Sequence, residues 1–229
     1  MDVGFGCGDS CKYLEEKLGC RVTGITNELS QVRMANERLS ADQKQRIHHL
    51  HGSAENLDDL IQPFTKAFDH ILCIDSAYHY NTRWDFFKSA FKYLKDSGGT
   101  LGLFDFTLHP ALFQSLKQSS WKLYAFKTLC NFIHVPSDNL LATPEEYKQK
   151  LYDAGFKNVQ LETVATEHVF DGLSRFMRQQ LLNASKYGIN VSLSDKLFLC
   201  GACFVFNLLA KNDWLTPLLV SAEKQESAP

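Results

Sequence analysis

The sequence has no excess of either charge, no long uninterrupted hydrophobic run and no cysteine framework. Its 229 residues include 24 Lys and Arg against 26 Asp and Glu, a net charge of −2 that gives nucleic acid no basic surface to bind. The longest apolar run, residues 197–210, is about 14 residues, shorter than the ~20 that a membrane-spanning helix needs. Seven cysteines without regular spacing indicate reduced thiols. We therefore predict no nucleic-acid partner, no transmembrane segment and a cytoplasmic location.

The first ten residues carry the most informative pattern, in which Asp2 is followed by Gly4, Gly6 and Gly8 at alternate positions. Glycine tolerates positive φ and lets a ligand approach the backbone closely. Such a pattern is typical of the turn between a buried strand and a helix, here expected over residues 11–18. In an open α/β sheet, ligands bind at the carboxyl ends of the strands, beside such a turn.

The glycine spacing distinguishes two classes of ligand. The dinucleotide fingerprint is G-x-G-x-x-G, but here the pattern is G-x-G-x-G and Asp9 stands where the third glycine would fall. An aspartate there would repel a pyrophosphate. The stretch resembles motif I of the class I S-adenosylmethionine-dependent methyltransferases, D-x-G-x-G-x-G, although an ordinary tight turn is the structural alternative. The resemblance implies that Asp2, through its neighbouring backbone, and Gly4, Gly6 and Gly8 hold the methionine and ribose portion of the cofactor. Because Met1 directly precedes Asp2, most of the expected first strand is missing; a fragment, a truncated gene model and a natural short form all stay open.

Later segments resemble the same family at matching spacing. Residues 20–26 are typical of a second strand, and the resemblance places ribose contacts at Thr26 and Gln31. Glu28 is a less certain third, since a carboxylate at a helix N-terminus is also favoured by the helix dipole. After the third strand, the segment beginning at Gly52 resembles the family's adenine-binding segment, which implies this role for Ser53 and Ala54.

A fourth strand, residues 68–75, leads into the phrase Asp75-Ser76-Ala77-Tyr78-His79-Tyr80. In the family this position faces both cofactor and substrate, which implies that Asp75 and Ser76 close the cofactor site. His79 is the best candidate for a base, because an ordinary histidine pKa of about 6.5 suits proton transfer near neutrality. Tyr78 and Tyr80 would hydrogen-bond the acceptor or line its pocket. A substrate-lining and a purely structural role for His79 stay open.

The remaining elements complete an α/β fold. Residues 100–106, 158–164 and 214–222 are expected to form the last three strands, and Thr143-Pro144-Glu145-Glu146 predicts a helix start with a capping box. We expect a doubly wound, Rossmann-like, seven-stranded methyltransferase sheet with a truncated first strand and helical cap insertions. The predicted organisation is a single methyltransferase domain over residues 1–229: a cofactor-binding core (1–107), a first cap insertion (108–142), a core helix and sixth strand (143–169), a second helical insertion (170–211) and a last strand (212–222).

The resemblance implies methyl transfer from S-adenosyl-L-methionine, with no metal. It is closest to the small-molecule group, which includes enzymes that modify sterols, tocopherols, polyketides and cyclopropane fatty acids. The implied acceptor is a small, largely apolar molecule methylated on oxygen, nitrogen or carbon. One alternative is a truncated or inactive paralogue that acts as a binding partner, with a homodimer covering the missing strand. A nicotinamide-dependent oxidoreductase is disfavoured by Asp9 and by the lack of a Tyr-x-x-x-Lys relay.

Overall fold

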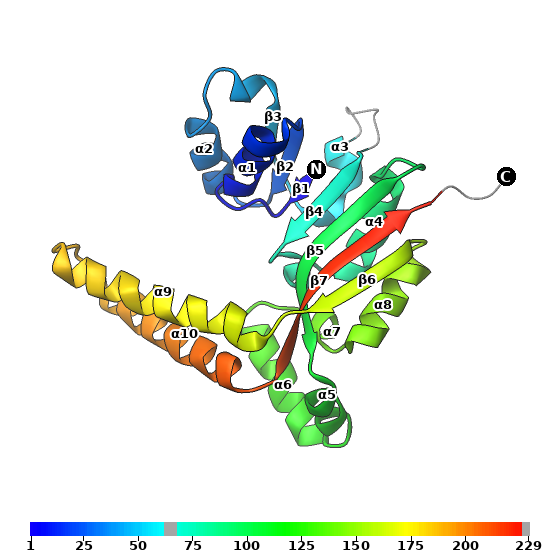
Figure 1. The fold of residues 1–229 in the computed structure, drawn as a ribbon. Helices are drawn as coiled ribbons and strands as arrows, with labels where there is room; N and C mark the ends of the chain where they lie inside the picture. The colour runs from blue at the N-terminus through cyan, green and yellow to red at the C-terminus, as the bar shows by residue number, and fades with distance from the viewer. Residues whose placement is uncertain (62–67, 226–229) are drawn as a thin grey trace.

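Seven strands form one mixed sheet in the order β3-β2-β1-β4-β5-β7-β6 (Figure 1). The structure is a computed structural model and describes residues 1–61 and 68–225. Neighbouring strands from β3 to β5 are parallel, and β7 runs antiparallel between β5 and β6. The predicted seven-stranded α/β sheet is confirmed. Its strands are β1 (Asp2–Val3), β2 (Val22–Thr26), β3 (Ile47–His51), β4 (His70–Ile74), β5 (Gly99–Leu108), β6 (Lys157–Thr163) and β7 (Leu215–Lys224).

The first strand is only two residues long but is central to the sheet. Asp2 pairs in parallel with Gly24 of β2 on one side and with Leu72 of β4 on the other. The carbonyl oxygen of Met1 also accepts a hydrogen bond from the Leu72 amide at 2.8 Å. The short first strand that the sequence predicts is present as these two residues. These two residues connect β2 and β4 within the sheet.

Helices cover both faces of the β2 end of the sheet, as a doubly wound fold requires. Val22 packs in a cluster with residues of α1 (Asp9–Leu18) and α2 (Leu29–Glu37), whereas Ile25 belongs to the cluster of α3 (Leu57–Ile61), α4 (Arg83–Tyr93) and α8 (Pro144–Asp153). Over β4, β5 and β7 the coverage is one-sided, with α4 and α8 behind the sheet in Figure 1. On the other face Ile74 is 49% and Leu219 46% exposed. Short 3-10 segments cover Gln43–Gln45, Ala54–Asn56 and Ala77–His79.

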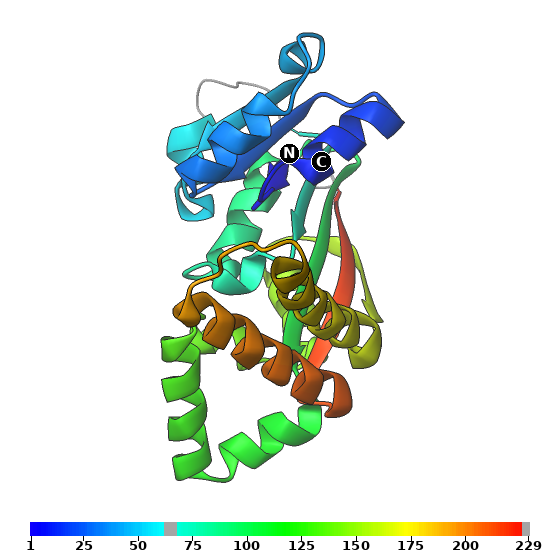
Figure 2. The same ribbon diagram turned by 90° about the vertical axis from the view of Figure 1, so that its left-hand side faces the viewer.

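Two helical insertions extend from the carboxyl-terminal part of the sheet. The first contains α5 (Pro110–Lys117), α6 (Ser120–Phe132) and α7 (Ser137–Leu140). The second is a hairpin of α9 (Thr166–Lys186) and α10 (Leu193–Lys211), which projects away from the sheet in Figure 1 and lies on the viewer's side of the sheet in Figure 2. The hairpin lies where the sequence predicts a helical insertion, although α9 begins four residues before the predicted boundary.

The second helix of this hairpin is longer than the apolar run suggests. An 18-residue window of α10 has a mean hydropathy of 1.6, and none of that window is buried. Length and composition alone would allow this helix to cross a membrane, a criterion that core helices of other proteins also meet. The absence of a transmembrane segment therefore stays a prediction.

Candidate functional site

A cavity of about 570 Å³ lies at the carboxyl ends of β1, β2, β3 and β4. The segments that follow these four strands line it, together with His134 from the chain after α6. Three of the predicted site residues, Asp2, Gly8 and Tyr78, do not line the cavity. The structure brings the other ten together: Gly4, Gly6, Thr26, Gln31, Ser53, Ala54, Asp75, Ser76, His79 and Tyr80.

The three glycines of the first turn have different structural roles. Gly4 has a φ of 82°, and a Cβ there would lie 2.1 Å from Ser76 Oγ, so the first turn abuts the loop after β4. Gly6 has a φ of 58° and lines the cavity, and a Cβ there would meet nothing within 4 Å. Gly8 precedes α1, where a Cβ would lie 2.8 Å from Ala35 Cβ of α2. Gly6 thus leaves room for a ligand, whereas Gly4 and Gly8 allow close packing of the chain on itself.

The Asp2 side chain connects the two ends of the glycine turn through hydrogen bonds to the first residues of α1. Its Oδ2 accepts hydrogen bonds from Ser10 Oγ at 2.5 Å and from Cys11 Sγ at 3.4 Å. Burial raises the pKa of Asp2 above its ordinary value, and the hydrogen bonds from Ser10 and Cys11 act in the opposite direction. Asp2 therefore fixes the start of α1 against β1, and its predicted contribution to cofactor binding through neighbouring backbone stays a prediction.

The end of β2 places several polar groups on the cavity. Thr26 Oγ1 donates to Gln31 Oε1 at 2.6 Å, and the Glu28 amide donates to Thr26 Oγ1 at 3.3 Å. Glu28 lines the same cavity, as does Glu55 after β3. With Asp75 these residues make three lining carboxylates, and the lining residues include no Lys or Arg. Such a cavity favours a ligand that carries positive charge.

Two tyrosine hydroxyl groups form hydrogen bonds within the loop at the end of β4, Tyr78 with Asp75 and Tyr80 with Ser76. Tyr78 Oη donates to Asp75 Oδ1 at 3.0 Å, and burial raises the pKa of Asp75 while this hydrogen bond opposes the shift. Tyr80 Oη lies 2.8 Å from Ser76 Oγ, and burial raises the pKa of Tyr80 well above its ordinary value. Both hydroxyl groups are therefore engaged within this loop. The His79 ring is exposed to the cavity and makes no hydrogen bond to any described residue.

A buried polar network holds the loop that carries His79. Asn139 Nδ2 donates to the carbonyl oxygens of Tyr78 and Tyr80, at 2.9 and 2.5 Å. Asn139 in turn accepts a hydrogen bond from the Arg83 amide at 3.2 Å through its side-chain oxygen, and its carbonyl oxygen accepts one from Arg83 Nη2. Both residues are fully buried. The backbone on each side of His79 is therefore attached to the protein interior.

Sequence reasoning did not select four of the residues that shape this site. His134 and Glu55 line the cavity, while Arg83 and Asn139 position the His79 loop. Glu55 directly follows Ser53 and Ala54, so that segment gave a local signal. His134, Arg83 and Asn139 do not belong to any segment that resembles the family. Arg83 and Asn139 are also 56 positions apart, so no local pattern connects them.

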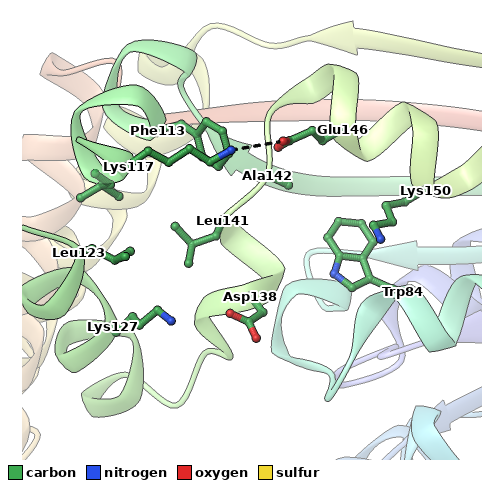
Figure 3. A pocket seen from close by; sticks show the side chains of 11 residues that line it. Trp84, Phe113, Lys117, Leu123, Lys127, Asp138, Leu141, Ala142, Glu146 and Lys150 are labelled. Carbon is green, nitrogen blue, oxygen red and sulfur yellow. Dashed lines mark ion pairs between the residues drawn. The ribbon is translucent and has the colours of Figure 1, made fainter. Parts of the chain in front are cut away.

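A separate groove of about 460 Å³ lies between the first insertion and α8 (Figure 3). Phe113, Leu123 and Leu141 contribute apolar side chains, and Lys117 Nζ lies 3.8 Å from Glu146 Oε1 across it. None of its lining residues lines the larger cavity at the strand ends. This groove is therefore separate from the candidate site.

The sheet order defines an α/β protein with a carboxylate-lined cavity at its parallel strand ends. The family described as "Methyltransferase domain" matches residues 1–98. The chain is 30% identical over 208 residues to phosphoethanolamine N-methyltransferase of Plasmodium falciparum, covering 85% of this chain and 69% of that protein. It is 32% identical over 182 residues to erythromycin 3''-O-methyltransferase of Saccharopolyspora erythraea, covering 78% of this chain and 57% of that enzyme. It thus spans little more than half the length of this second relative.

The fold is also found among solved structures. The cyclopropane synthase MmaA2 of Mycobacterium tuberculosis superposes with a TM-score of 0.71 at 17% identity, covering 96% of this chain and 76% of that one. The chain belongs to the class I S-adenosylmethionine-dependent methyltransferases. The resemblance drawn from the glycine turn and the later segments is confirmed.

Proposed function

We propose that this protein transfers a methyl group from S-adenosyl-L-methionine to a small acceptor molecule. The observation that carries the proposal is the cavity at the strand ends, because four separate segments bring ten predicted site residues to its wall. Its three carboxylates and its lack of Lys and Arg fit a cationic sulfonium cofactor. The open space at Gly6 fits a ligand that lies against the backbone.

Different residues of the cavity would bind different parts of the cofactor. Gly4 and Gly6 would hold its methionine portion, with Asp2 and Gly8 shaping the turn from behind. Thr26, Gln31 and Glu28 would bind the ribose, and Ser53 and Ala54 the adenine. Asp75 and Ser76 would close the site from β4.

His79 is the residue best placed to act on the acceptor. When bound, the cofactor would supply an electrophilic methyl carbon and a thioether leaving group that keeps the electron pair of the broken carbon–sulfur bond. The chain contributes position and exclusion of water, which are the main protein contributions to such a transfer. His79 would take up the proton released by a hydroxyl or amine acceptor, because its ring is free while both tyrosine hydroxyls are engaged. Tyr78 and Tyr80 would hold Asp75 and Ser76 in place.

The acceptor and its reacting atom are left open by this proposal. The names of the two relatives describe an N-methyltransferase and an O-methyltransferase, which supports a small molecule without selecting the atom. The largely apolar character of the acceptor and the cytoplasmic location stay predictions. A homodimer also stays a prediction, which the exposed Ile74 and Leu219 on the uncovered sheet face support. Light scattering of the purified chain would test it.

The first experiment is isothermal titration of the 229-residue chain with S-adenosylmethionine, S-adenosylhomocysteine and NADH. We expect micromolar binding of both sulfur ligands and none of NADH. A folded chain, established by circular dichroism, that binds neither sulfur ligand would contradict the proposal and favour the inactive paralogue. NADH binding alone would favour the oxidoreductase.

A further inference from the structure

A second, smaller cavity adjoins the proposed cofactor site. It has a volume of about 330 Å³, and His79 and His134 line both cavities. A molecule seated in the smaller cavity would therefore lie next to the ring of the proposed base. The smaller cavity is thus a natural place for the part of the acceptor that does not react.

The walls of the two cavities differ in charge. The larger one carries three carboxylates, whereas none of the residues lining the smaller one is acidic. Lys127 and Asn131, at positions i and i+4, share one side of α6, and both line the smaller cavity together with His134, which follows the helix. With His79 they supply a permanent cation and three further side chains able to donate hydrogen bonds. This set favours an anion.

Lys127 is available for such a ligand. Its ammonium group forms no ion pair within residues 1–61 and 68–225. Figure 3 shows Lys127 and Asp138 on the wall of the neighbouring groove, where the ion pair drawn joins Lys117 and Glu146. Asp138 lines that groove but not the smaller cavity.

We propose that the cavity formed by His79, Lys127, Asn131 and His134 binds a phosphate group of the methyl acceptor. This inference rests on the proposed function and names the substrate class for the same site. A phosphate monoester carries up to two negative charges and three terminal oxygens, which match the several donors here better than the two oxygens of a carboxylate do. The acceptor thus has an anionic end in the basic cavity and its methylated atom near His79. This assignment departs from the prediction of a largely apolar acceptor.

The charges also explain how such an acceptor would be oriented. Glu28, Glu55 and Asp75 would repel a phosphate from the larger cavity, while Lys127 would attract it to the smaller one. An acceptor bound with its ends exchanged would place its phosphate against carboxylates. The two cavities together therefore select one direction of binding.

The test uses inorganic phosphate as the probe and the full chain, both without cofactor and with saturating S-adenosylhomocysteine. The NMR signals of the His79 and His134 rings report binding, at constant ionic strength and pH. We expect saturable shifts of both rings, with phosphate binding more tightly than acetate. Lys127→Gln should weaken phosphate binding about tenfold, the effect of losing one charge-assisted contact of about 1.4 kcal/mol.

The matched control is Lys122→Gln on the same helix. Lys122 Nζ donates to Ser115 Oγ at 2.8 Å and does not line the cavity, so this variant should bind phosphate within twofold of the unmodified chain. Equal losses in the two variants, or acetate binding as tightly as phosphate, would overturn the proposal. Lys127→Gln should leave the affinity for S-adenosylmethionine unchanged. A failure of the cofactor titration in the folded chain would refute the proposed function separately, because phosphate binding does not depend on methyl transfer.

Discussion

The buried ion pair between Arg83 and Asp105 allows a quantitative test of how the His79 loop is held. Arg83 Nη1 lies 2.9 Å from Asp105 Oδ2 and donates to the Phe106 carbonyl at 2.7 Å, and both charged side chains are fully buried. The guanidinium carbon also lies 4.7 Å from the Tyr147 ring centroid. Tyr147 Oη donates to Asp105 Oδ2 at 2.9 Å, and burial raises the pKa of Tyr147 well above its ordinary value.

Arg83→Met should lower the free energy of unfolding by about 3–5 kcal/mol, because it leaves a buried carboxylate without its cation. Arg83→Met/Asp105→Leu removes both charges and should lose less, since apolar replacement of a buried pair is often close to neutral. The double variant should still lose about 1 kcal/mol or more, because Tyr147 Oη and the Phe106 carbonyl lose buried partners.

Urea unfolding followed by circular dichroism measures these differences. Lys88→Met on the same helix is the control, because Lys88 pairs with Asp85 in solvent, and it should change stability by less than about 0.5 kcal/mol. A loss below about 1 kcal/mol in Arg83→Met would refute the reasoning. The reasoning would also be refuted if Arg83→Met/Asp105→Leu were no more stable than Arg83→Met.

Three further substitutions test the site itself. Gly4→Ala should reduce both stability and cofactor affinity, because its Cβ would clash with the loop after β4. Gly98→Ala is the control, since Gly98 has a φ of 74° and open space around it. This variant should lose only about 1 kcal/mol of stability and keep its cofactor affinity in the same titration. Asp75→Asn should weaken the binding of S-adenosylmethionine more than the binding of S-adenosylhomocysteine, whose sulfur carries no positive charge. In the unmodified chain the pKa of Asp75 is raised, so ionisation of this carboxyl group costs stability once the pH rises through that pKa. Asp75→Asn should therefore raise the melting temperature of the ligand-free chain at pH 7. The cofactor affinity of the unmodified chain should fall as the pH drops through the same pKa. Asn139→Ala should lower kcat for methyl transfer more than cofactor affinity, because it frees the backbone around His79; an unchanged kcat with reduced stability would show a structural role only.

Local sequence patterns were sufficient for the elements whose structure depends on neighbouring residues. The helix start at Thr143 is one example: Thr143 Oγ1 accepts from the Glu146 amide at 3.2 Å, and Glu146 Oε2 accepts from the Thr143 amide at 2.9 Å. The alternate glycines also predicted a turn with positive φ, and all three adopt it. Such features involve residues within a few positions of one another, so the order of residue types determines them.

The sequence pattern was a weaker guide to what happens between distant segments. It left most of the first strand unaccounted for, and only the structure shows that Asp2 and Val3 pair with β2 and that Asp2 also pairs with β4. It assigned similar roles to Gly4, Gly6 and Gly8, yet their functions differ with the segment that lies opposite each one.

The sequence by itself determined the order of strands and helices, the glycine turn and the phrase after β4, and with them the family. Only the tertiary structure decided that His134 joins His79, that Lys127 faces the same cavity, and that Arg83 and Asn139 support the loop between Tyr78 and Tyr80. The physical reason is that charge, burial and hydrogen bonding depend on distance in space. Residues that lie far apart in the sequence acquire these properties together only when the sheet and its insertions have folded.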